Sequence, residues 1–135
     1  MVARWLTSRG HIVRLAPLTK APTRADWKDH VDDGDLEIAL RVEVKRLSAN
    51  FTNAKDWPFG SKFIVCAKHA FDNARPKPHS FIIVNAAGTH AAIVEGRTSR
   101  DWTVERKTDS RMDGVSQECY LAPMDCVTFT TLADR

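Results

Sequence analysis

The chain has 135 residues, of which 43% are hydrophobic, so it can form one compact soluble domain with its own core but has no room for a second full domain. Charged residues make up 27% of the chain, and four Trp and six Phe are spread along it, which argues against a disordered tail. The net charge of +3 is uneven, because residues 1–30 carry +4, residues 31–60 carry −2 and residues 61–135 carry +1. In such a chain the acidic stretch can hold a cation, while the basic surroundings attract a polyanion.

The chain lacks the features of a membrane or secreted protein. No apolar run approaches the roughly 20 residues of a membrane span, and the first ten residues contain no signal-like apolar block. We therefore expect a cytoplasmic protein without a membrane partner. Cys66, Cys119 and Cys126 form no C-x-x-C pair, which indicates neither a disulfide framework nor a zinc site, and we expect them to be small buried hydrophobic residues.

The N-terminal third contains few regular elements. A short helix is expected over residues 2–8, where apolar residues recur at i, i+3 and i+4, and Gly10 closes it. A strand follows over residues 11–15. Residues 17–30 contain two prolines and predict a long connection that ends in a helical turn.

From Gly34 to Leu47 apolar and charged residues alternate, which predicts a β-hairpin with one buried face. Further strands are expected over residues 62–67, 81–85, 90–95, 102–107, 116–121 and 127–132. A hairpin turn over residues 86–89, a loop over 73–78 and a helical turn over 122–126 connect them. These elements predict a single α+β domain over residues 1–135, with a central mixed or antiparallel sheet flanked by few short helices.

The register of the expected hairpin can be chosen by parity, because a one-residue slip turns every side chain to the other face. A three-residue connection over Ala39–Arg41 places all apolar residues on one face. It pairs Ile38 with Val42, Glu37 with Glu43, Leu36 with Val44 and Asp35 with Lys45. The opposite face then carries three carboxylates and one lysine.

Such a face predicts a cation site. Directly opposed side chains have Cβ atoms about 5 Å apart, so Asp35 and Glu43 can reach one ion, and an ion would offset the repulsion between Glu37 and Glu43. Mg²⁺ or Mn²⁺ is held by one or two carboxylates together with water and phosphate oxygens, and Lys45 beside it could act on the attacking water or on the phosphate. The alternative is an ordinary solvated hairpin face with cross-strand salt bridges. Asp32 and Asp33 fit loop acids better than ligands.

This stretch resembles the PD-(D/E)XK nuclease superfamily, whose metal site combines an Asp at the start of one strand with E-x-K on the next. The matching residues are Gly34-Asp35-Leu36-Glu37-Ile38 and Arg41-Val42-Glu43-Val44-Lys45-Arg46. The chain is also similar to small phage-encoded members. The resemblance covers residues 2–67 and implies a restriction-endonuclease-like core.

Carried over to this sequence, the resemblance implies that Asp35, Glu43 and the Val44 carbonyl bind the metal and that Lys45 is catalytic. The family's Pro is replaced by Gly34. The helix Glu of many members has no counterpart in residues 2–8, which leaves Glu37 as an accessory ligand.

Basic side chains are candidates for contact with DNA. The candidates for this role are Arg4, Arg9, Lys28 and Arg46. Trp27, Trp57 and Trp102 lie near basic residues and could stack on bases, but core packing is the preferred reading.

We expect a Mg²⁺- or Mn²⁺-dependent DNA endonuclease that hydrolyses phosphodiester bonds with metal-activated water. The alternative is a weak or inactive nuclease-like module that binds nucleic acid or protein. RNA stays open as a substrate, since no residue reads a 2′-hydroxyl. With one site per chain, a homodimer would be needed to cut both strands.

Overall fold

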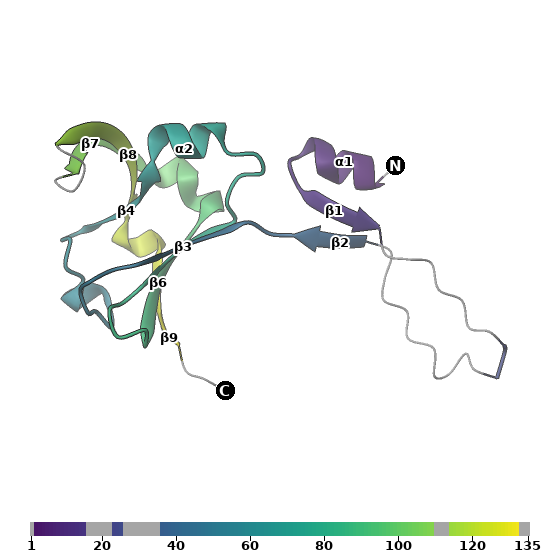
Figure 1. Cartoon of the computed structure of the whole chain (residues 1–135), viewed down its shortest axis with the longest axis horizontal. Helices are drawn as coiled ribbons and strands as arrows, with labels where there is room; N and C mark the ends of the chain where they lie inside the picture. The colour runs from purple at the N-terminus through teal and green to yellow at the C-terminus, as the bar shows by residue number, and fades with distance from the viewer. Residues whose placement is uncertain (1, 16–22, 26–35, 110–113, 133–135) are drawn as a thin grey trace. The chain divides into compact units, whose positions relative to one another are not determined.

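The computed structural model describes residues 2–15, 23–25, 36–109 and 114–132. It divides the chain into two compact units, Met1–Leu40 and Arg41–Arg135 (Figure 1). None of the helices in the described ranges is long and apolar enough to cross a membrane. The single domain expected over residues 1–135 stays a prediction.

The first unit contains helix α1 (Val2–Ser8) and strands β1 (Ile12–Leu15) and β2 (Leu36–Ala39). Gly10 ends α1 in the left-handed region, with φ of 85°, and its N–H donates to the Thr7 carbonyl at 2.9 Å. The two strands pair antiparallel. Every described side chain of this unit is exposed or half-buried, so backbone pairing rather than a core holds these residues. The predicted helix and first strand are confirmed.

The second unit is built on two sheets. The four-stranded sheet has the order β3 (Val42–Arg46), β5 (Ser80–Val84), β6 (His90–Glu95) and β9 (Val127–Thr131). β3 and β5 run parallel, whereas the other neighbours are antiparallel. The three-stranded sheet is antiparallel, with the order β4 (Lys62–Ala67), β8 (Val115–Pro123) and β7 (Thr103–Asp109).

Short helical segments connect these strands. Helix α2 (Lys68–Asn73) directly follows β4 and packs against β4 and β8 (Figure 1). Three 3₁₀ turns are η2 (Ala54–Asp56), η3 (Gly96–Asp101) and η4 (Met124–Cys126). The turn expected at residues 122–126 is therefore confirmed. The sequence gives little sign of α2, because the helix has only six residues and Ala67 at its N-cap makes no side-chain hydrogen bond.

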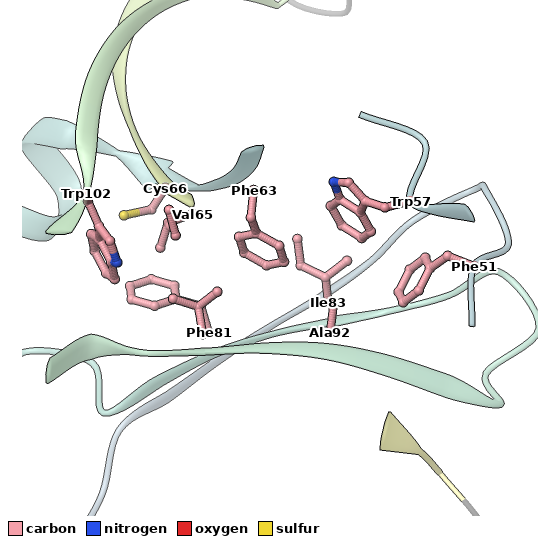
Figure 2. Close-up of a cluster of buried hydrophobic side chains, with 11 residues drawn as sticks. Phe51, Trp57, Phe63, Val65, Cys66, Phe81, Ile83, Ala92 and Trp102 are labelled. Atoms are coloured by element: carbon pink, nitrogen blue, oxygen red, sulfur yellow. The ribbon is translucent and has the colours of Figure 1, made fainter. Parts of the chain in front are cut away.

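The core lies between the two sheets of the second unit. Figure 2 shows Phe63 and Val65 of β4 facing Phe81 and Ile83 of β5. Aromatic rings fill much of this space, and the rings of Trp57 and Phe63 stack with centroids 5.3 Å apart.

The expected burial of side chains is largely confirmed. Trp57 and Trp102 are 6% and 8% exposed, so core packing is their role, whereas Trp27 lies outside the described residues. Cys66 and Cys119 are free and buried, and the half-buried Cys126 packs against the core.

The coarse fold class is confirmed: the second unit is α+β, with one mixed and one antiparallel sheet and few helices. The strand predicted at residues 90–95 has the observed bounds, and the hairpin turn at 86–89 joins β5 to β6. The helical turn expected at residues 25–30 lies largely outside the described residues.

The predicted hairpin between residues 34 and 47 is wrong. Both strands form, but β2 pairs with β1, and β3 pairs in parallel with β5. Alternation in a sequence shows which side chains share a face, but it does not show which strand supplies the hydrogen bonds. The opposition of Glu37 and Glu43 across a ladder is therefore not formed.

The predicted orientation of β3 is also wrong. Glu43 and Lys45 are in register with Phe81 and Ile83 of β5, so the charged residues lie on the side of the sheet that faces the core. Val44, on the other side, is 63% exposed. This arrangement is possible because β3 is the outer strand of the four-stranded sheet, where the apolar core ends and long charged side chains can reach water.

Candidate active site

Strand β3 brings Glu43 and Lys45 together. Side chains two residues apart in a strand lie on the same face, and both of these residues line one pocket of about 340 Å³. Arg41, which precedes β3, lines the same pocket. The expectation that Glu43 and Lys45 share a face of their strand is therefore confirmed, whereas their roles in a site stay predictions.

The pocket combines a polar side with an apolar side. The polar side chains come from the β3 region and from Gln117 of β8. The apolar wall is formed by Ala67, Ala70, Phe71, Pro78 and Phe81, with the thiol of Cys66 beside them. Of the charged residues, Arg41 and Lys45 are cationic and Glu43 is anionic, so the lining carries a formal excess of one positive charge.

Arg41 forms an ion pair with Glu43. Its Nε donates to Glu43 Oε1 at 2.9 Å, and a second nitrogen of the guanidinium contacts the same oxygen. Both side chains are well exposed, so this pair contributes at most about 1 kcal/mol to stability. A metal or a phosphate could therefore displace either partner at low cost.

The backbone before β3 is held by the loop that leads into β5. The N–H of His79 donates to the carbonyl of Arg41 at 2.8 Å, and the N–H of Gly96 donates to the carbonyl of His79 at 2.7 Å. A Cβ atom on Gly96 would lie only 2.1 Å from the backbone oxygen of Pro78. Gly96 therefore allows the close approach that positions Arg41 and Pro78 at the pocket.

Lys45 connects the two sheets beside the pocket. Its Nζ lies 3.4 Å from the backbone oxygen of Val65 in β4, which makes a weak hydrogen bond. The neighbouring thiol is neutral at physiological pH, because burial raises the pKa of Cys66 to about 11 although the positive charge of Lys45 opposes this shift. The neutral thiol therefore forms no ion pair with Lys45.

The described residues supply only part of a metal site. Within the described ranges, His, Cys, Asp and Glu side chains form no group of three or more that could hold a metal ion. Glu43 offers one carboxylate, and Asp35 lies outside the described residues. One or two carboxylates with water and phosphate oxygens are enough for Mg²⁺, so Glu43 fits as one ligand of such an ion. The roles of Asp35 and of the Val44 carbonyl stay predictions.

The other candidates lie on other elements of the two units or outside the described residues. Glu37 is exposed on β2, which pairs with β1. Arg4 is exposed on α1, and the guanidinium of Arg9 lies 4.4 Å from the centre of the Trp5 ring. Arg46 contacts the backbone oxygen of Ala86. Lys28 lies outside the described residues. Their proposed contacts with DNA stay predictions.

Cys66, Phe71 and Gln117 are among the pocket residues that the sequence does not mark as site candidates. The sequence predicts Cys66 only as a core residue, Phe71 belongs to helix α2, which the sequence does not predict, and Gln117 follows no pattern that marks a site. All three meet β3 only through the packing of β4, α2 and β8, which no local pattern shows.

A second hollow, of about 320 Å³, is lined by Lys68, His69, Asp72, Asn73 and Glu118. Its central carboxylate is already bound: Asp72 accepts hydrogen bonds from Lys68 Nζ at 2.5 Å and from the Tyr120 hydroxyl at 2.9 Å. The hydrogen bond from Lys68 is the main reason that the pKa of Asp72 is lowered. These two hydrogen bonds engage the Asp72 carboxylate and anchor α2 to β8.

Comparison with protein-family models, with curated proteins and with solved structures finds no match to this chain.

Proposed function

We propose that the chain is a metal-dependent nuclease of the PD-(D/E)XK type that hydrolyses phosphodiester bonds in DNA. The observation that carries this proposal is the shared pocket of Glu43 and Lys45, which project from the same face of β3 with Arg41 beside them. A carboxylate, a lysine and an arginine in one pocket provide a metal ligand and two cations that can bind a phosphate.

In this proposal Mg²⁺ or Mn²⁺ would be held by Glu43 and, as the sequence predicts, Asp35 and the Val44 carbonyl, with Glu37 as an accessory. The bound ion would lower the pKa of water and polarise the phosphoryl oxygen. Water adds to phosphorus and releases a proton to solvent, the bond from phosphorus to the leaving sugar oxygen breaks, and that oxygen takes up a proton from solvent.

The protein's own cations act on the phosphate. The ammonium of Lys45 binds a phosphate oxygen and stabilises the charge that builds on it. Arg41 can turn from Glu43 to a second phosphate oxygen, because the exposed ion pair is weak. Two copies of the chain would be required to cut both strands of a duplex.

The test is cleavage of labelled single-stranded, duplex and branched DNA by the purified chain with Mg²⁺ or Mn²⁺. We expect cleavage that EDTA abolishes and that Lys45→Ala reduces about a hundredfold or more. Lys55→Ala is the matched control, because it removes one lysine charge from the exposed turn η2, outside the pocket. If Lys45→Ala cleaves as well as the parent, the proposal fails.

A second candidate function is a nucleic-acid-binding module that does not cut. The observation that favours it is the Arg41–Glu43 ion pair, which occupies the only carboxylate among the described residues of the pocket. This module would bind DNA equally well in EDTA and in Mn²⁺, and it would show no cleavage of any substrate.

A further inference from the structure

The candidate pocket is larger than a phosphate group requires. Its volume of about 340 Å³ is within the range of about 300–1,000 Å³ that is typical of sites for whole small molecules. A phosphate on the outside of a duplex needs only surface cations. The additional space therefore points to a ligand that enters the protein beside the phosphate.

The apolar wall has the chemistry of a base-binding surface. Phe71 and Phe81 line it with their ring centroids 6.1 Å apart, and Pro78 lies beside them. Phe71 is half-buried and Phe81 is buried, so both rings are fixed by the core rather than free to reorient. The half-buried Phe71 ring can contact a nucleobase of any sequence, whereas the Phe81 ring, 4% exposed, supports it from the core.

The lining also contains polar groups whose chemistry suits the other parts of a nucleotide. Arg41 and Lys45 favour an anion, and Gln117 adds an amide that can both donate and accept hydrogen bonds to a base edge. A nucleotide combines these three features: an anionic phosphate, an apolar ring face and a polar ring edge.

We propose that this pocket accommodates one unpaired nucleotide next to the phosphate that Lys45 contacts. This inference rests on the proposed nuclease function for the identity of the ligand as nucleic acid. A paired base in a duplex is stacked and cannot enter a pocket, so the preferred substrates are flaps, frayed ends or single strands. The substrate class proposed for this site is therefore DNA that contains unpaired nucleotides.

The test compares two fluorescent DNA probes, a blunt hairpin duplex and the same hairpin with a three-nucleotide single-stranded flap. Binding is measured by anisotropy in EDTA, where no cleavage occurs. We expect the parent chain to bind the flap probe about tenfold more tightly, which corresponds to about 1.4 kcal/mol. Equal binding of the two probes overturns the inference.

Ala70→Leu tests the pocket itself. Ala70 is exposed on α2 and lines the pocket, so a larger side chain there fills the space without disturbing the core. We expect the preference for the flap to fall to about twofold or less, while the blunt probe binds as before. His69→Leu is the matched control, because it adds an apolar side chain at an exposed position of the same helix that does not line this pocket.

Gln117→Ala provides an independent variant if Ala70→Leu melts below the parent chain. It removes the amide without filling the pocket, and we expect it also to lower the preference for the flap. If each variant weakens binding of the flap probe and of the blunt probe by the same factor, the inference is wrong. Cleavage assays distinguish failure of this inference from failure of the nuclease proposal. If the chain binds the flap probe more tightly in EDTA but cuts no DNA with Mn²⁺, only the nuclease proposal is disproved.

Discussion

Arg41 and Glu43, which both line the pocket, form an ion pair with Nε of the arginine 2.9 Å from Oε1 of the glutamate. The acid proposed to bind a metal therefore already has a cationic partner. Arginine and a divalent ion would compete for the same carboxylate oxygens, and this competition can be measured.

We predict that Arg41→Ala strengthens the binding of Mn²⁺. Removing the guanidinium frees Glu43, and an exposed pair contributes up to about 1 kcal/mol, so the gain in affinity is expected to reach roughly fivefold. Isothermal titration of the metal-free chain with Mn²⁺ gives the dissociation constant. Arg46→Ala is the control, because Arg46 lies in the same strand as Glu43 but contacts the backbone oxygen of Ala86 rather than an acid. Unchanged or weaker Mn²⁺ binding in Arg41→Ala would show that Glu43 is not a ligand.

Much of the local structure could be predicted from the sequence, because it depends on short-range patterns. The strand over 90–95 follows from β propensity and the turn before it, and the end of α1 follows from Gly10. The strand partners could not be predicted in the same way. The β3–β5 pairing joins segments almost 40 residues apart, and an apolar and charged alternation suits either a hairpin or a parallel neighbour.

The candidate site was also predictable only in its local part, not in its tertiary contacts. The E-x-K spacing places Glu43 and Lys45 on one face in any strand, so their proximity could be predicted without knowledge of the fold. The direction of that face could not be predicted, because β3 is the outer strand of its sheet, where long charged side chains on the core side can still reach water. Phe71 and Gln117 reach the pocket only through tertiary packing.

The second prediction concerns stability at alkaline pH. Burial raises the pKa of Cys66 from 9.0 to about 11 in the folded chain. Between pH 9 and 11 the unfolded chain therefore loses the thiol proton first, so it binds fewer protons than the folded chain and the free energy of unfolding falls as pH rises. Urea unfolding at pH 8 to 10.5 should show this decrease.

Cys66→Ala is the matching variant for that experiment. It lowers stability at all pH values because it removes buried volume, but it should show a shallower decrease between pH 9 and 10.5. The remaining slope is expected from Cys119 and Tyr120, since burial raises the pKa of both. Parallel curves for parent and variant would mean that the Cys66 thiol titrates normally.

The third prediction concerns the buried amide of Asn85. This side chain is 2% exposed, and it donates to the Phe51 carbonyl at 3.0 Å and accepts from the Thr89 N–H at 2.9 Å. Asn85→Leu removes the side-chain donor of the carbonyl of buried Phe51 and the acceptor of the Thr89 N–H, so we expect a loss of at least about 2 kcal/mol in the free energy of unfolding.

Denaturant unfolding measures this loss, and Asn50→Leu is the control. Asn50 is exposed and accepts one hydrogen bond, from the Ala87 N–H at 2.9 Å, so its replacement should cost less than about 1 kcal/mol. Equal losses in the two variants would contradict the role assigned to Asn85 in joining the β5–β6 turn to the Phe51 loop.

The fourth prediction links stability to the pocket through Gly96. A Cβ there would lie 2.1 Å from the Pro78 oxygen, so Gly96→Ala must displace the loop whose His79 N–H holds the Arg41 carbonyl. We expect a loss of about 1–3 kcal/mol together with weaker binding of the flap probe. Gly88→Ala is the control. The φ of +74° at Gly88 makes an alanine there strained by about 1–2 kcal/mol, but the added Cβ would meet no other atom within 4 Å. Gly88→Ala should therefore lower the melting temperature to a similar degree and leave probe binding unchanged. If the two variants affect binding equally, the loop at Pro78 does not position the pocket.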